Sequence, residues 1–208
     1  MPLGKEKKPI LEQVILNLRK AGVKDFIITV SHLGYQIKNY FGDGKRFGVK
    51  IEYAEEKKPL GTAGCLVPLK EKVGNETFLL VAGDNLTSMN MKKFIQAHKK
   101  NAKKGAILTI ALAEASLPVE YGVVETKDSI VTGFKEKPTL KYNVATLIMC
   151  LEPAIFKYIP KGFSNITDHV FPRLLASREK IYGHKFKDFW ADIGKLEEYN
   201  KMNSELHL

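Results

Sequence analysis

Apolar positions alternate between two spacings along the first half of the chain. The residues Ile10, Leu11, Val14, Ile15 and Leu18 recur with helical spacing and predict a helix. Pro9 marks its start and Gly22 its end. The run Phe-Ile-Ile-Thr-Val at 26–30 follows and is typical of a buried parallel strand. The same criteria predict a helix at 37–41, an alternating strand at 49–53 and another continuous buried strand at 78–82.

The second half of the chain continues the mixture of helices and strands. The patterns predict helices at 91–103, 153–159, 168–177 and 195–203, and strands at 106–112, 122–125, 130–135, 143–151 and 181–186. Strands that alternate with helices favour an α/β fold, in which a parallel or mixed sheet is covered by helices on both faces. Since no linker, low-complexity stretch or internal repeat interrupts residues 1–208, we expect a single domain.

Composition excludes several classes of protein. No apolar run approaches the roughly 18 residues of a membrane span, and the amino terminus has no apolar segment behind its lysines, so no secretory signal is predicted. Cys65 and Cys150 both lie inside apolar segments, which indicates two buried thiols in a cytoplasmic protein.

The chain carries a formal net charge of +10, which could attract phosphate esters or nucleic acid. The lysines, however, are scattered or sit on helix faces, and no aromatic residues interleave with the group of Lys92, Lys93, Lys99, Lys100, Lys103 and Lys104. This pattern favours a solvated surface over a nucleic-acid groove, so no nucleic-acid partner is predicted.

Two aspartates occupy places that suggest chemistry. Asp84 follows Gly83 directly after the apolar run at 78–82, hence at the carboxyl end of a strand, where open α/β sheets bind ligands. Asp192 stands in Phe-Trp-Ala-Asp-Ile-Gly, among apolar residues. Taken singly, each is explained as a turn residue or a helix cap. If they converge, two carboxylates could hold Mg²⁺, a hard cation that prefers oxygen ligands.

Glycine turns and a charged strand end add weaker candidates. Pro-Leu-Gly-Thr-Ala-Gly at 59–64 and the turn at Gly122 would allow a ring or a phosphate to approach the backbone, although ordinary turns explain them equally. Lys-Glu-Lys-Pro at 135–138 could neutralise a phosphate and accept sugar hydroxyls, or simply end a strand. The five histidines show no metal-ligand spacing.

In their order, these pieces resemble the sugar-1-phosphate nucleotidyltransferase family, which makes NDP-sugars from an NTP and a sugar 1-phosphate. The resemblance covers nearly the whole chain and is strongest toward mannose-1-phosphate guanylyltransferases. It is carried by the segments PLGKEKKPILEQVI, YFGDGKRFGVKIEYAEEKKPLGTAG, LLVAGDNLT, YGVVE, GFKEKP and FWADIGKLEEYNKMN.

The resemblance implies roles for individual residues. Asp84 and Asp192 match the two metal-binding aspartates, with Mg²⁺ as the cofactor. The nucleotide site would include Glu56, Gly61, Thr62 and Gly83, and the sugar-phosphate site Gly122, Glu136, Lys137 and Leu147. Together with Asp84 and Asp192, Lys137 would serve the reaction, an in-line attack of the sugar phosphate on the α-phosphorus in which pyrophosphate leaves.

The chain also departs from the family pattern. It begins after the glycine-rich GGxGTRL-like loop and the first strand, so a Rossmann-like, mainly parallel sheet with its first strand missing is expected. Leu147 stands where the family has glycine, and Thr167 and His169 stand where it has Glu and Asp. We therefore expect poor turnover of NTP by the chain as given, and a non-catalytic nucleotide-sugar-binding or regulatory relative is the alternative. Strand edges left unpaired could be covered by another subunit, so a homo-oligomer is a further expectation.

Overall fold

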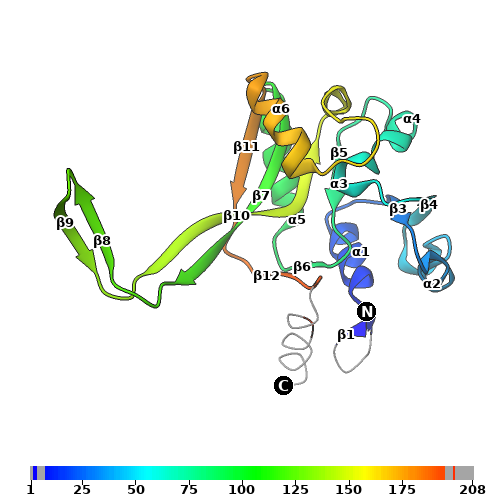
Figure 1. Ribbon diagram of the computed structural model, residues 1–208. Coiled ribbons are helices and arrows are strands. Elements are labelled where there is room, and N and C mark those ends of the chain that lie inside the picture. The colour runs from blue at the N-terminus through cyan, green and yellow to red at the C-terminus, as the bar shows by residue number, and fades with distance from the viewer. Residues whose placement is uncertain (1, 4–7, 195–198, 200–208) are drawn as a thin grey trace.

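The central sheet of the protein has four strands. The computed structural model describes residues 2–3, 8–194 and 199. The sheet has the order β11-β7-β10-β5, formed by Lys180–Lys185, Ala106–Pro118, Thr139–Leu151 and Phe78–Val81 (Figure 1). β11 runs parallel to β7, whereas β10 runs antiparallel to both β7 and β5. A mixed sheet is thus confirmed, but the expectation that it would be mainly parallel is wrong, because β7 and β10 are the two sides of one long hairpin and hairpins join antiparallel strands.

Helices cover both faces of this sheet. Phe94 of α5 (Met91–Ala102) is fully buried in one cluster, with Ala111 and Ile148 of the sheet. Leu174 of α6 (Phe171–Ala176) is fully buried in a second cluster, with neighbouring sheet residues such as Leu108. Successive side chains of a strand point to opposite faces, and this alternation divides β7 between the two clusters.

A separate parallel pair of strands lies beside the central sheet. β3 (Asp25–Val30) pairs in register with β4 (Lys50–Glu55), and β3 has no second strand partner among the described residues. The helices α1 (Ile10–Lys20) and α2 (Gly34–Phe41) accompany this pair, where Ile15 and Phe41 are buried in a third cluster. β3 and β5 therefore belong to two different sheets, and each has one edge without a strand partner among the described residues.

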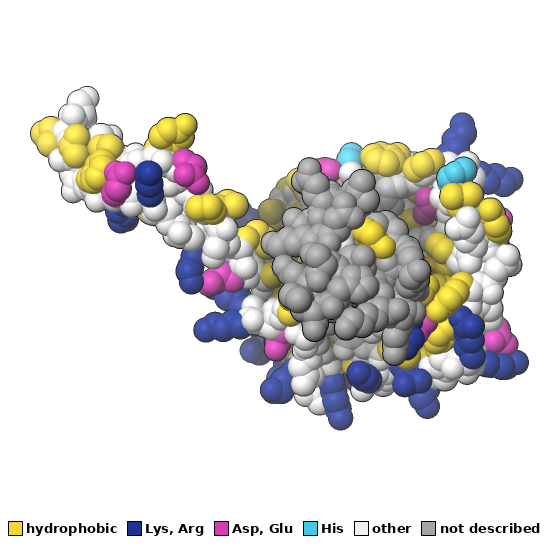
Figure 2. Space-filling model, turned by 90° about the horizontal axis from the view of Figure 1, so that it is seen from below, with side chains coloured by type: hydrophobic (Ala, Val, Ile, Leu, Met, Phe, Trp, Pro, Cys, Tyr) yellow, Lys and Arg dark blue, Asp and Glu magenta, His cyan; other side chains and the backbone are white. Residues whose placement is uncertain are grey.

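The hairpin of β7 and β10 extends into an arm that leaves the body (Figure 1). Its outer part is the antiparallel pair β8 (Val123–Lys127) and β9 (Ile130–Lys135). Hydrophobic side chains lie exposed along the arm (Figure 2), including Tyr121 and Phe134. Both strand predictions for this region are confirmed, although β7 and β10 are longer than their patterns predicted.

Short elements complete the chain. These are β1 (Pro2–Leu3), β2 (Lys8–Pro9), η1 (Lys45–Phe47), α3 (Gly61–Gly64), η2 (Val67–Leu69), α4 (Lys70–Val73), β6 (Asn85–Thr87), η3 (Pro153–Lys157), the π-helical turn η4 (Ile166–Val170) and β12 (Trp190–Asp192). The final helix predicted for 195–203 falls almost entirely outside the described residues. No helix in the described part of the chain is long and apolar enough to cross a membrane.

Candidate functional site

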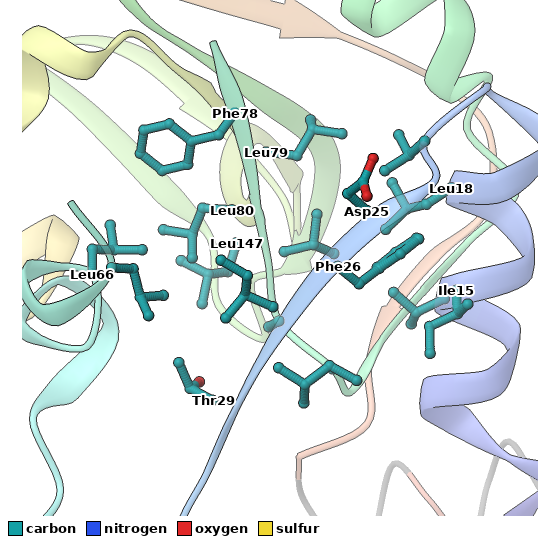
Figure 3. A pocket seen from close by; sticks show the side chains of 18 of the residues that line it. Ile15, Leu18, Asp25, Phe26, Thr29, Leu66, Phe78, Leu79, Leu80 and Leu147 are labelled. Carbon is teal, nitrogen blue, oxygen red and sulfur yellow. The ribbon is translucent and has the colours of Figure 1, made fainter. Parts of the chain in front are cut away.

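A large cavity separates the two sheets. It has a volume of about 1720 Å³ and is bounded by β3 on one side and β5 on the other, so we name it the β3–β5 cavity (Figure 3). Seven of the residues predicted for the site line it: Glu56, Gly61, Thr62, Gly83, Asp84, Leu147 and Asp192. Most of them follow the carboxyl ends of β4 and β5, the edge at which open α/β sheets bind ligands.

Asp84 and Asp192 lie side by side at this edge although 107 residues separate them in the chain. The antiparallel pairing of β6 with β12 sets Asp192 opposite Asn85. The N–H of Ile193 donates to the carbonyl oxygen of Asp84 at 3.1 Å. Asp84 Oδ2 and Asp192 Oδ1 each lie 3.2 Å from the point that a Cβ on Gly194 would occupy. The absence of a side chain at Gly194 therefore leaves the two carboxylates facing a common space.

Two residues that the sequence did not single out hold Asp84 in place. Asn85 is buried, and its side-chain amide donates to Asp84 Oδ1 at 3.3 Å. The indole N–H of Trp190 in turn donates to Asn85 Oδ1 at 2.7 Å. In the sequence, the only signal for this role of Asn85 was its place as a polar residue directly after Asp84. Its contact with Trp190, which is 105 residues away, could not be predicted from the sequence.

The carboxylate oxygens of Asp84 and Asp192 fit a hard divalent cation that also binds a substrate phosphate. The described residues contain no group of three or more His, Cys, Asp or Glu side chains that could enclose a metal on their own. Mg²⁺ needs fewer protein ligands, because it is commonly bound by one or two carboxylates together with waters and substrate phosphates. Asp84 and Asp192 would hold such an ion beside the cavity.

The turn that follows β4 forms the cavity wall beside the aspartates. Glu56 Oε2 accepts a hydrogen bond from the N–H of Leu60 at 3.1 Å and closes this turn. Thr62 Oγ1 accepts from the N–H of Ile166 at 2.9 Å, which fastens α3 to η4. Glu56 and Thr62 thus line the cavity, and the side chain of each accepts a hydrogen bond from a backbone N–H of the protein.

Gly61 is explained by a close backbone contact. Its φ is +77°, and a Cβ there would lie 2.5 Å from the carbonyl oxygen of Ser164. Only glycine accommodates both the left-handed conformation and this approach. The structure therefore gives Gly61 a packing role, whatever it also contributes to a ligand.

Leu147 lies deep in the cavity and away from the other predicted sugar residues. It packs against the cluster that contains Leu66, next to Leu80 (Figure 3). The resemblance assigned it to the sugar-phosphate site with Lys137 and Gly122, but its side chain packs in the hydrophobic cluster of Leu66 and Leu80. The structure does not bring these three residues together.

Gly122, Glu136 and Lys137 lie at the elbow of the arm, between the β7–β10 hairpin and the outer pair β8–β9. There the N–H of Val119 donates to the carbonyl oxygen of Pro138 at 3.0 Å, and a Cβ on Gly122 would lie 3.0 Å from Glu136 Oε2. Lys137 is exposed and has a φ of +41°. None of the three elbow residues predicted for the sugar phosphate lines the β3–β5 cavity.

The cavity also contains a thiol with weak acidity. Burial, reinforced by the charge of Glu56, raises the pKa of Cys65 to about 11. Burial likewise raises the pKa of Cys150 to about 12. Both groups therefore stay protonated at neutral pH, which argues against a nucleophilic cysteine here.

Comparison with known proteins assigns this arrangement to a family. The family model described as nucleotidyl transferase matches residues 1–207. A UTP–glucose-1-phosphate uridylyltransferase of Synechocystis is 35% identical over 93% of this chain and 54% of its own length. A mannose-1-phosphate guanylyltransferase of Mycobacterium tuberculosis is 30% identical over 95% of this chain and 56% of its own length. The chain thus spans about half the length of these curated relatives.

Solved structures share the fold. The crystal structure of HddC from Yersinia pseudotuberculosis superposes with a TM-score of 0.73, at 21% identity, over 95% of this chain and 85% of that one. A second structure of HddC is complexed with GMP-PN. At this level of identity the likeness supports the α/β architecture, and the chemistry must be argued from the residues of this chain.

Proposed function

Because the chain belongs to the nucleotidyl transferase family, whose members related to it act on sugar 1-phosphates, we propose that it transfers a nucleoside monophosphate from an NTP to a sugar 1-phosphate. The products would be an NDP-sugar and pyrophosphate. The convergence of Asp84 and Asp192 beside Gly194 is the observation that carries this proposal. Such phosphoryl chemistry depends on positioning and on charge neutralisation, which this carboxylate pair can provide through a metal ion.

The proposed division of labour follows the sequence prediction. Asp84 and Asp192 hold Mg²⁺, which when bound neutralises phosphate charge. Asn85 and Trp190 orient Asp84. The nucleotide lies along the wall formed by Glu56, Gly61, Thr62 and Gly83, and the sugar phosphate meets Gly122, Glu136 and Lys137.

The proposed substrates are those of a mannose-1-phosphate guanylyltransferase. The identity of 30% to the mycobacterial guanylyltransferase supports this choice, while the identity of 35% to the cyanobacterial uridylyltransferase favours a uridine nucleotide and glucose 1-phosphate. The two possibilities are separated by the nucleobase, so a survey of nucleotides decides between them.

One observation favours a non-catalytic relative that only binds nucleotide-sugars. Lys137, the cation proposed for the sugar phosphate, lies at the elbow of the arm and does not line the cavity that holds the aspartates. A protein that only binds nucleotide-sugars would need the aspartates and the cavity wall. It would not need Lys137 to lie close to the aspartates.

Calorimetry with GTP, UTP, ATP, dTTP and the NDP-sugars, with and without Mg²⁺, tests the proposal. We expect GTP or GDP-mannose to bind and the affinity to depend on Mg²⁺. Pyrophosphate release with a sugar 1-phosphate separates an enzyme from a binding protein. Absence of any nucleotide or NDP-sugar binding with Mg²⁺ would contradict the proposed function.

A further inference from the structure

The outer pair of the arm, β8 and β9, gathers hydrophobic side chains on one of its two faces. The strand register sets Val124 opposite Phe134 and Thr126 opposite Val131. Directly opposite residues share a face, and so do residues two apart on one strand. These four side chains therefore lie on one face, where Val124, Val131 and Phe134 are 49%, 63% and 63% exposed. We name it the apolar face of the outer pair.

The opposite face of the outer pair is polar and has its charges compensated. Glu125 and Lys127 of β8 lie there, because they alternate with Val124 and Thr126 along the strand. Lys135, opposite Val123, donates to Glu125 Oε1 at 2.9 Å. The outer pair is thus an amphipathic ribbon in which the ion pair and the hydrophobic side chains occupy different faces.

The inner part of the arm, formed by β7 and β10, repeats this division. Leu140 lies opposite Leu117, and Tyr142 lies opposite Ala115. Leu117, Leu140 and Tyr142 are 54%, 36% and 52% exposed. Lys141 alternates with Leu140 and Tyr142, so it lies on the other face, where its ammonium group is 3.0 Å from a carboxylate oxygen of Glu114. Both parts of the arm therefore have an uncovered apolar face.

Nothing in the described part of the chain covers these faces. β8 and β9 pair only with each other there, and each of their residues is half-buried or exposed. A two-stranded hairpin alone is marginally stable in water and gains stability when its hydrophobic face packs against something else. The arm extends away from the body of its own chain (Figure 1). A covering surface is therefore expected from outside that chain.

The distribution of charge favours a second copy as the covering surface. The arm, residues 115–142, contains four acidic and four basic side chains and so has no net charge: Glu120, Glu125, Lys127, Asp128, Lys135, Glu136, Lys137 and Lys141. The whole chain has a formal net charge of +10, so all of this excess lies outside the arm. Two copies would repel each other through their bodies but not through their arms.

We infer that the arm is a dimerisation surface, which binds the arm of a second copy with apolar face against apolar face about a two-fold axis. Identical faces are self-complementary in such an arrangement. The six partly exposed side chains offer about 400 Å² per copy, hence about 800 Å² in the dimer. A standard interface buries roughly 1,200–2,000 Å², of which slightly more than half is apolar. The inference is independent of nucleotidyl transfer.

Two neighbouring residues of β9 supply the test and its matched control. Val131 lies on the apolar face of the outer pair, whereas Ile130, 69% exposed, points to the opposite face. Sedimentation of the wild type should show a dimer. Val131→Glu would place a charge inside the contact, so we expect its dimer dissociation constant to rise at least about 10-fold. Ile130→Glu introduces the same charge outside the contact and should dimerise like the wild type.

Cross-linking gives a second measurement that leaves Val131 and its hydrophobic neighbours unchanged. Thr126→Cys places a thiol on the apolar face, and Lys127→Cys places one on the polar face, both at exposed positions. The two natural thiols are largely protonated at neutral pH because burial raises the pKa of Cys65 to about 11 and that of Cys150 to about 12. A short bismaleimide should therefore join two copies of Thr126→Cys and leave Lys127→Cys mainly single.

Three results would overturn the inference. A monomeric wild type with slow hydrogen exchange in β8 and β9 would mean that the arm is covered by its own chain, and a monomeric wild type with fast exchange would mean that the arm stays uncovered. A dimer that persists unchanged in folded Val131→Glu, with equal cross-linking of Thr126→Cys and Lys127→Cys, would place the contact elsewhere on the molecule. Circular dichroism of each variant establishes that it is folded.

Discussion

Lys72 of α4 donates a hydrogen bond to Glu52 of β4 at 2.6 Å and so joins the β3–β4 pair to the segment that leads into β5. Lys50 contacts the other oxygen of the same carboxylate at 2.9 Å. Both Glu52 and Lys72 line the β3–β5 cavity. This ion pair therefore joins β4 to the helix that precedes β5, and no strand in the described part of the chain makes that link.

This bridge predicts a pH dependence of stability. The bond from Lys72, followed by that from Lys50, lowers the pKa of Glu52 from 4.5 to about 2. The native state thus favours the ionised carboxylate, and its contribution is present above pH 4.5 and disappears as the pH falls toward 2. Glu52→Gln should have a lower free energy of unfolding than the wild type at pH 6, and the two proteins should match near pH 2. Because the pair is exposed, 1 M salt should also reduce the difference at pH 6, and a difference that persists at pH 2 would contradict the assignment.

The aspartate pair predicts a loss of metal-dependent binding. Asp84→Asn and Asp192→Asn each remove one anionic ligand, so we expect Mg²⁺-dependent affinity for a nucleotide to fall at least about 10-fold. Asp128→Asn is the matched control, because Asp128 lies on the arm between β8 and β9 and has a φ of +47°, which asparagine tolerates. Equal losses of affinity in all three variants would mean that the loss does not arise from the pair Asp84 and Asp192.

Gly61 predicts a stability effect that a second glycine can calibrate. Gly61→Ala meets both a positive φ and the carbonyl oxygen of Ser164, whereas Gly162 has a φ of +83° with nothing within 4 Å of its virtual Cβ. We expect Gly162→Ala to cost about 1 kcal/mol for the backbone alone, and Gly61→Ala to cost about 2 kcal/mol or more. Chemical unfolding measures both, and equal costs would mean that the contact with Ser164 relaxes freely.

The two thiols predict an order of reactivity. With pKa values of about 11 for Cys65 and about 12 for Cys150, alkylation by iodoacetamide at pH 8 should be on the order of 100-fold slower than for a free thiol. Cys65, only partly buried, should react first, and Cys150 mainly after unfolding. Mass spectrometry of the labelled peptides gives the order, and rapid labelling of native Cys150 would contradict its burial.

Local patterns predicted the elements whose hydrophobic positions follow a clear helical or strand period. α1 has the predicted stripe, β3 covers the predicted run, and β8 and β9 form the predicted pair. β7 and β10 were underestimated because their outer halves are largely exposed, so no burial pattern marks residues such as Ser116 or Tyr142. Their pairing with each other extends those strands.

The site was predictable in its parts but not in its assembly. The position of Asp84 after a strand could be read from the sequence, while its contact with Asn85 and the closeness of Asp192 depend on the pairing of β6 with β12. The place of Lys137 depends on the direction in which the arm leaves the body, which no local pattern encodes. Leu147 was assigned to a sugar pocket from one position in a resemblance, and its side chain instead packs with Leu66 and Leu80.

In the described part of the chain, the open edges of β3 and β5 face the cavity between the two sheets, which bears on their contact with other sheets. An open edge on the outside of a sheet invites the edge of any other folded sheet, which is a common beginning of aggregation. Here each edge is screened by the opposite strand, with α1 and η2 above and below. A folded sheet with its own covering layers is too thick to reach either edge, so these two edges do not invite pairing with the sheet of another folded protein.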